Sequence, residues 1–196
     1  MHYLDYAIFH HMGLSHIPAR HLMAGRYEEP GYEVVSTFPG FEVRRYSDSI
    51  QARVRTEGKN MGDSTRGFRR IAGYIFGRND RGQIIAMTAP VHMWNDGEGE
   101  IMAFTMPSKY SLADLPTPND QGVKLVNYFG CTLAALQFSG LSGPRRSGRM
   151  KTKLNRMVLE NGLSPTGPPM LAVYDNPTST LPFLRRNEIL LPVEDG

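Results

Sequence analysis

Histidine side chains are the strongest candidates for chemistry in this sequence, because neutral imidazole is a common ligand of transition metals. Five of the six histidines lie within the first thirty residues, and the sixth, His92, stands in the apolar run QIIAMTAPVHMW at 83–94. His16 and His21 are five positions apart, unlike the His-Glu-x-x-His pattern of zinc enzymes, and residues 6–27 contain no Asp or Glu. A dedicated zinc site is therefore disfavoured, whereas one of these histidines could supply a single axial ligand to a metal held in a macrocycle.

Nucleophilic and nucleotide-dependent chemistry find little support. Cys131 is the single cysteine, and no group near it in the run CTLAALQF would activate a thiolate. The segment GLSGP at 140–144 departs from the Gly-x-Ser-x-Gly elbow of hydrolases, and GYIFGRNDRG lacks both the Walker lysine and the Rossmann spacing. We expect Cys131 to pack in the interior without a catalytic role.

Positive charge gathers in two stretches of a chain whose formal net charge is +3. These stretches contain Arg66, Arg69 and Arg70, and then Arg145, Arg146, Arg149, Lys151, Lys153 and Arg156. Such clusters favour anionic partners in general. No recognition motif or row of stacking aromatic residues accompanies them, so nucleic acid is disfavoured as a partner.

The composition is that of an ordinary globular protein. The 196 residues are 40% hydrophobic and 21% charged, which favours one compact domain. No run reaches the roughly 18 apolar residues of a membrane span, and the first thirty residues lack the pattern of a signal peptide. We therefore expect a cytoplasmic protein. Residues 1–30 are predicted to be an extension that packs on the domain or is partly disordered, and residues 31–196 to form the domain.

Apolar periodicity places the elements of the first half. Phe68, Ile71, Ala72 and Ile75 recur at the spacing of one helical face, between a capping Asp63 or Ser64 and a terminating Gly77. Alternating residues predict strands at 32–38, 41–57, 83–94 and 100–107, the first two joined as a hairpin at Pro39-Gly40.

The same order recurs after the proline-bearing loop at 108–122. Strands are predicted at 123–129, 131–140, 170–175 and 187–193, with a helix from Ser147 to Asn161 whose buried face includes Leu154 and Val158. Each ββαββ half alone would expose one face of its sheet, so the two halves should share a core. A groove between a helix and the sheet would be the natural place for a small ligand.

Four segments give the chain a family resemblance. They are NDRGQIIAMTAPV at 79–91, MPSKYSLADLPTPNDQGVKL at 106–125, LQFSG at 136–140 and AVYDNPTSTLPFLRRNEILLPV at 172–193. In these segments the chain resembles the SOUL family of haem-binding proteins, over about residues 32–193. The resemblance implies an α+β fold, a distorted antiparallel β-barrel built from two ββαββ repeats and flanked by two helices.

The same resemblance implies a function. It indicates reversible binding of haem or another tetrapyrrole by a soluble carrier or buffer. Some relatives in photosynthetic organisms resemble haem dechelatases, so release of iron from haem is an alternative. More distantly similar effector-binding domains bind small cationic or apolar molecules, which is a second alternative. The oligomeric state stays open.

The resemblance also indicates where a porphyrin would lie. In the family's mammalian haem-binding branch the macrocycle is placed on the first helix, which carries over to Thr65, Phe68, Ala72 and Gly73, and near the loop at 176–185. With the apolar stripe of the helix and the apolar loop residues, the predicted surface comprises Thr65, Phe68, Ile71, Ala72, Ile75, Leu181, Pro182 and Phe183.

This chain departs from that branch at three helix positions. An arginine there is Thr65 here, a methionine is Phe68 and a lysine is Gly73, so two cations that could meet the propionates are absent. Arg66, Arg69 and Arg70 are candidates to replace them.

Family members differ over the iron ligand, and some use a histidine before the first strand. By that analogy His21 is the first candidate here, followed by His16 and His92. Strand alternation sets His92 on the side opposite Met87 and Met93. If that apolar side faces the core, His92 faces outward, which ranks it behind the N-terminal histidines.

Overall fold

The computed structural model describes residues 27–56, 61–175 and 180–194. Within these ranges the chain forms one nine-stranded sheet, two α-helices and a short 3-10 helix. The strands are β1 (Tyr32–Phe38), β2 (Phe41–Tyr46), β3 (Ser49–Thr56), β4 (Val91–Asn95), β5 (Glu100–Thr105), β6 (Val123–Tyr128), β7 (Thr132–Ser139), β8 (Met170–Val173) and β9 (Arg186–Pro192). The helices are α2 (Met61–Ile75), α3 (Pro144–Glu160) and η2 (Pro182–Leu184).

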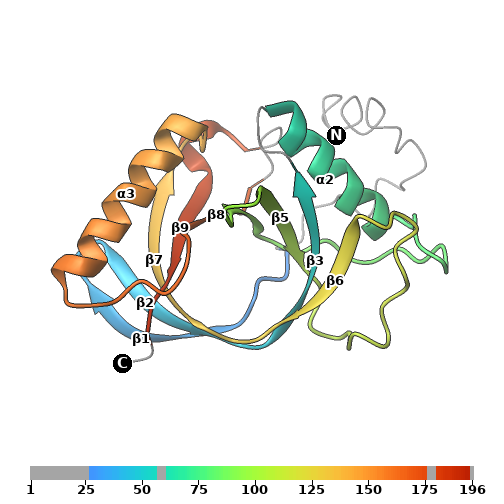
Figure 1. Ribbon diagram of the computed structural model, residues 1–196, viewed down its shortest axis with the longest axis horizontal. Helices are drawn as coiled ribbons and strands as arrows, with labels where there is room; N and C mark the ends of the chain where they lie inside the picture. Colours follow the sequence, from blue (N-terminus) through green and yellow to red (C-terminus); the bar gives the residue numbers. More distant parts are fainter. Residues whose placement is uncertain (1–26, 57–60, 176–179, 195–196) are drawn as a thin grey trace.

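The antiparallel sheet has the order β1-β2-β7-β9-β8-β4-β5-β3-β6 and curls into a half-barrel, with both helices on its outer face (Figure 1). Its two repeats, β2-β3-α2-β4-β5 and β6-β7-α3-β8-β9, meet where β4 pairs with β8. The first strand of each repeat pairs with a strand of the other repeat, β2 with β7 and β6 with β3. The predicted α+β fold, a distorted barrel of two ββαββ repeats, is confirmed.

β1 lies outside the two repeats and forms the predicted hairpin with β2. The single strand predicted at 41–57 is wrong, because the chain leaves the ladder at Ser47 and Asp48. There Ser47 N donates to Gly31 O at 3.0 Å, and Asp48 Oδ1 accepts from Gly130 N at 2.6 Å. These bonds fix the segment at Ser47 and Asp48, where the chain passes from β2 to β3 in the other half of the sheet.

The strand predicted at 83–94 is likewise too long, since β4 begins at Val91. The preceding residues form isolated bridges, and Pro90 follows a cis peptide bond and has no N–H for a ladder. Ile85 N donates to Ile75 O at 2.8 Å, and the Ile85 side chain is fully buried. This stretch therefore closes the core at the end of α2.

Each helix has its own core beneath it. α2 packs on β3, β5 and β6, where Ile71 joins a cluster that contains Phe104. α3 packs on β7 and β9 through Leu154 and Val158, as its periodicity predicted. Met93 contacts both clusters, so the two cores are joined at the centre of the sheet.

The C-terminal end of α2 has a turn that matters for the site. Gly77 has φ +100°, Arg78 N donates to Gly73 O at 2.8 Å, and Gly77 N donates to Tyr74 O at 3.3 Å. This is the Schellman arrangement, which favours glycine because of its left-handed backbone. α3 ends in the same arrangement at Gly162, as predicted, with Leu163 N donating to Val158 O and Gly162 N to Leu159 O.

α3 begins three residues before the predicted Ser147. Pro144 takes the first helical position, where its missing N–H leaves no intrahelical bond unmade. Ser147 is buried in the first turn and donates to Gly143 O at 3.2 Å. In the described part of the chain, neither α-helix is long and apolar enough to cross a membrane.

The concave face of the sheet is buried too, and it carries polar groups. Arg44 Nη1 donates to Glu188 Oε2 at 3.0 Å, and Tyr174 Oη donates to the same oxygen at 2.6 Å. His92 lies on this side and is 6% exposed. The expectation that His92 faces outward is therefore wrong, because a curled sheet with helices outside buries side chains on both faces.

Candidate functional site

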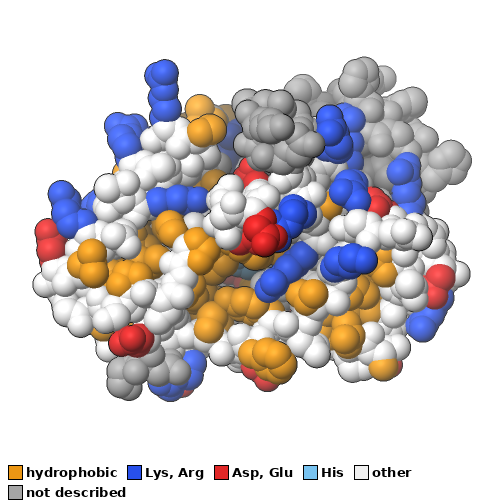
Figure 2. Space-filling model, viewed as in Figure 1, with side chains coloured by type: hydrophobic (Ala, Val, Ile, Leu, Met, Phe, Trp, Pro, Cys, Tyr) orange, Lys and Arg blue, Asp and Glu red, His pale blue; other side chains and the backbone are white. Residues whose placement is uncertain are grey.

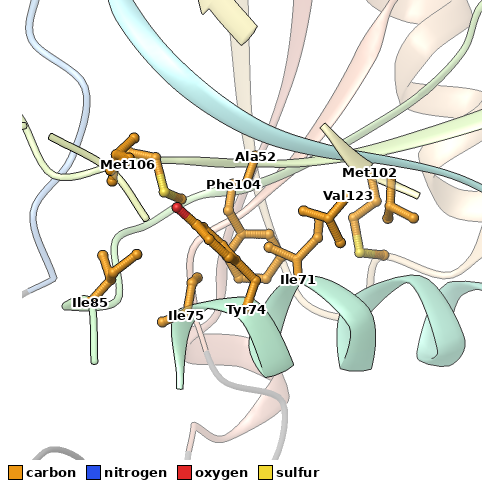
Figure 3. Close-up of a cluster of buried hydrophobic side chains, with 11 residues drawn as sticks. Ala52, Ile71, Tyr74, Ile75, Ile85, Met102, Phe104, Met106 and Val123 are labelled. Atoms are coloured by element: carbon orange, nitrogen blue, oxygen red, sulfur yellow. The ribbon is translucent and has the colours of Figure 1, made fainter. Parts of the chain in front are cut away.

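The inner face of α2 is committed to the protein core. Ile71, Tyr74 and Ile75 point from the helix toward the sheet and pack in the cluster shown in Figure 3. Ile71, Ala72 and Ile75 are at most 1% exposed. The predicted contribution of these three residues to a ligand surface needs correction, because they have no surface free for a ligand in this structure.

The outer side of α2 keeps the accessible part of the predicted surface. Thr65, Arg66 and Arg69 are exposed. Phe68 is partly buried, with its ring centroid 5.4 Å from that of Phe104. Phe68 therefore links the core to the surface, and the exposed arginines lie beside it on the helix.

An arginine lies over Gly73, the helix position at which the comparison with the family's mammalian branch leaves a cation absent. The side chain of Arg78 folds back over Gly73, and its Cδ lies 3.1 Å from where a Cβ on Gly73 would be. Its Nε is 3.8 Å from the same point, and the residue is exposed. The Schellman turn thus brings Arg78 to the helix position that carries a lysine in the family's mammalian branch.

Arg70 is occupied elsewhere. Its Nε and Nη2 each donate to an oxygen of Asp120 at 2.7 Å. The guanidinium lowers the pKa of Asp120 to about 2, so the carboxylate stays ionised at neutral pH. Arg70 therefore fastens α2 to the loop before β6 and does not serve as a free anion partner.

The described part of the C-terminal loop exposes apolar side chains. Leu181 is 58%, Phe183 68% and Leu184 63% exposed. Arg185 Nε donates to Thr180 O at 2.9 Å and closes the turn on itself, and η2 lies against β7. Consecutive exposed hydrophobic residues of this size on one turn indicate a binding surface. The sequence prediction omitted Leu184, although the run LPFL contained the signal.

Two of the three predicted iron ligands, His16 and His21, lie outside the described residues. His92 is buried, and burial is the main cause that lowers its pKa to about 4, with the charge of Arg53 adding to it. The described residues contain no group of three or more His, Cys, Asp or Glu side chains placed to hold a metal ion. Cys131 is partly buried, and its Sγ lies 2.9 Å from the hydroxyl oxygen of Tyr128.

A separate cavity of about 700 Å³ opens where β3 begins and where β5 and β6 end. Its acidic lining residues are Glu28, Glu29 and Asp48, and no described residue that lines it is basic. Ionised carboxylates repel the propionates of a porphyrin. The charge thus disfavours this cavity as a haem site. By contrast, Lys and Arg side chains are spread over the part of the surface near α2 and along α3 (Figure 2).

Comparison with known proteins agrees with the fold and the segment resemblance. The family model described as SOUL heme-binding protein matches residues 27–192. A curated relative, Heme-binding protein 1 of Bos taurus, is 26% identical over 129 residues. That match spans 62% of this chain and 66% of the bovine protein, slightly under two thirds of its length.

Two solved structures are similar in fold. The C-terminal domain of EcmrR has a TM-score of 0.62 at 13% identity, over 84% of this chain and 99% of that one. An uncharacterized conserved protein from Listeria innocua has a TM-score of 0.60 at 13% identity, over 79% of this chain and 92% of that one. At this identity the likeness concerns the fold alone.

Proposed function

Because the chain belongs to the SOUL haem-binding protein family, we propose that it binds haem or a related tetrapyrrole reversibly, as a cytoplasmic carrier or buffer. The observation that carries this proposal is the exposed apolar surface of Leu181, Phe183 and Leu184 on one turn. Burying one such side chain against a porphyrin plane stabilises a complex by about 1.5 to 3 kcal/mol. Together with Phe68 on α2, these residues form the proposed porphyrin surface.

Basic side chains on α2 suit the anionic rim of the ligand. Arg78 lies over Gly73, and Arg66 and Arg69 are exposed on the same helix. Guanidinium groups pair with carboxylates through charge-assisted hydrogen bonds. We assign propionate binding to Arg78 and Arg69 in the first place.

Reversible binding agrees with an open surface that has no strong iron ligand of its own. Neither α2 nor residues 180–185 contain a histidine. His21, and after it His16, remain the proposed axial ligands, and buried His92 stands behind them. The surface itself contributes apolar contact and ion pairs, which release a ligand more readily than a buried pocket does.

The enzymatic alternative, removal of iron from haem, needs protons delivered to the pyrrole nitrogens. The outer side of α2 offers Thr65, Phe68 and arginines in its described part, and arginine does not release a proton at neutral pH. This composition favours carriage over dechelation.

The test is a titration with excess haem, followed by Soret absorbance and by assays for free iron and metal-free porphyrin. We expect a saturable spectral change at one haem per chain, with neither product accumulating. Catalytic accumulation of metal-free porphyrin would favour the dechelatase instead. Absence of a saturable change at micromolar protein would refute haem binding.

A further inference from the structure

The 700 Å³ cavity lies next to a second, smaller one on the concave side of the sheet. The inner cavity, of about 20 Å³, shares Pro30, Ser47, Ser49, Thr105 and Tyr128 with the outer one. Its volume suffices for a single water-sized group. The two spaces are therefore adjacent, and we treat the outer one as the wide mouth and the inner one as the narrow end of a single site.

The narrow end carries two buried polar atoms without a hydrogen-bond partner among the described residues. They are Thr105 Oγ1 and His92 Nδ1, on residues that are 5% and 6% exposed. Buried polar groups are almost always paired, so two such atoms in one cavity indicate a partner that binds there. A hydroxyl group, of a water molecule or of a ligand, can satisfy both atoms because it donates and accepts.

Charge separates the two ends of this site. Arg53 lies close enough to His92 to lower its pKa, which disfavours a cation at the narrow end. At the mouth, Glu28 accepts a hydrogen bond from Ser108 N at 2.7 Å and Asp48 one from Gly130 N at 2.6 Å. Glu29 pairs with Arg186. Glu28 and Asp48 are held by backbone amides, so their negative charge remains available to a cation.

The outer cavity also has an apolar and aromatic lining. Tyr110, Tyr128 and Phe129 line the outer cavity with Ile50 and Met106, and Phe129 is 74% exposed. Aromatic side chains of this kind favour an aromatic ligand body.

We propose that this double cavity binds a phenolic amine, with the hydroxyl group on Thr105 and His92 and the protonated amine facing Glu28 and Asp48. The site is separate from the proposed porphyrin surface and binds a ligand of the opposite charge. It does not depend on whether the chain binds haem.

Four related probes in isothermal titration calorimetry test the proposal. Tyramine has both groups, 2-phenylethylamine lacks the hydroxyl, 4-ethylphenol lacks the amine, and 3-(4-hydroxyphenyl)propionate reverses the charge. We expect tyramine to bind about tenfold more tightly than either truncated probe, and the propionate to bind most weakly. Equal affinity for tyramine and the propionate, or no saturable binding of tyramine, would overturn the proposal.

Thr105→Val removes the hydroxyl while keeping the side-chain shape. We expect it to weaken tyramine about tenfold and to leave 2-phenylethylamine unchanged, because only tyramine reaches Thr105. The melting temperature should not fall, since the lost hydroxyl has no partner in the fold. Equal weakening of both amines would contradict the assignment of the hydroxyl group to Thr105. If neither amine binds more weakly, a water molecule and not the ligand occupies the inner cavity, and the assignment is wrong.

Asp48→Asn and Phe129→Ser test the mouth and the aromatic wall. Both variants should weaken tyramine and leave the haem titration unchanged. If they weaken haem and spare tyramine, the cavity is the tetrapyrrole site and the present proposal is wrong.

Discussion

Arg78 shows how a residue of the proposed site can escape a comparison made position by position. Aligned by position, the family's lysine is Gly73 here and the cation is missing. In the folded chain, the turn after α2 returns Arg78 over that same glycine. Because this replacement depends on backbone geometry five residues downstream, comparison of residue types alone could not find it.

Arg78→Gln should therefore weaken haem binding by about three- to tenfold, the size of an exposed charge-assisted contact. Arg149→Gln, an exposed arginine on α3, is the matched control and should have no effect. The measurement is a Soret titration of both variants. Equal affinities for the two would remove Arg78 from the site.

His92 makes stability depend on pH through its buried imidazole. Its pKa is about 4 in the folded chain and close to its usual 6.5 in the unfolded chain. Between these values the unfolded state binds the extra proton. The contribution of His92 to stability is therefore complete above pH 6.5 and is lost as pH falls toward 4, in total about 3 kcal/mol.

Urea unfolding of the native chain and of His92→Asn, at pH 7 and pH 5, checks this dependence. The native chain should lose about 2 kcal/mol more of its free energy of unfolding than the variant over this interval. Parallel losses in the two proteins would mean that His92 titrates normally.

The helices and strands were largely predictable, because periodicity reports which face of an element is buried. It does not report what covers that face. The apolar stripe of α2 predicts that Ile71 and Ile75 contact a ligand, yet that stripe is the side on which α2 packs against the sheet. The breaks at Ser47 and before Val91 depend on long-range bonds to Gly31, Gly130 and Ile75, which local patterning does not contain.

Gly77 and Gly162, which end α2 and α3, should both resist replacement by alanine. Gly162→Ala should cost about 1 kcal/mol, because alanine is strained at φ +75° while no heavy atom lies within 4 Å of the new Cβ. Gly77→Ala should cost more, since its Cβ would also lie 3.3 Å from Gly82 O. Chemical denaturation measures both losses.

Haem titration then separates the roles of the two turns. Only Gly77→Ala should weaken haem binding, because it disturbs the turn that places Arg78. Weaker haem binding in both glycine variants would point to a general loss of structure and not to this turn.

At the scale of the whole molecule, the exchange of β2 and β6 makes the two repeats depend on each other. Neither repeat holds a complete sheet without a strand of the other, and Met93 joins the two cores. We expect a single cooperative unfolding transition, with equal calorimetric and van't Hoff enthalpies. Two resolved transitions in differential scanning calorimetry would show that the repeats unfold independently.

We propose that the tetrapyrrole binds to α2 and η2 and not in the acidic cavity. Phe183 and Phe129 are similarly exposed, at 68% and 74%, on different surfaces. A Soret titration that compares Phe183→Ser with Phe129→Ser tests this proposal. We predict that Phe183→Ser weakens haem binding by about ten- to hundredfold while Phe129→Ser leaves it unchanged. Loss of affinity in Phe129→Ser with native affinity in Phe183→Ser would place the tetrapyrrole in the acidic cavity instead.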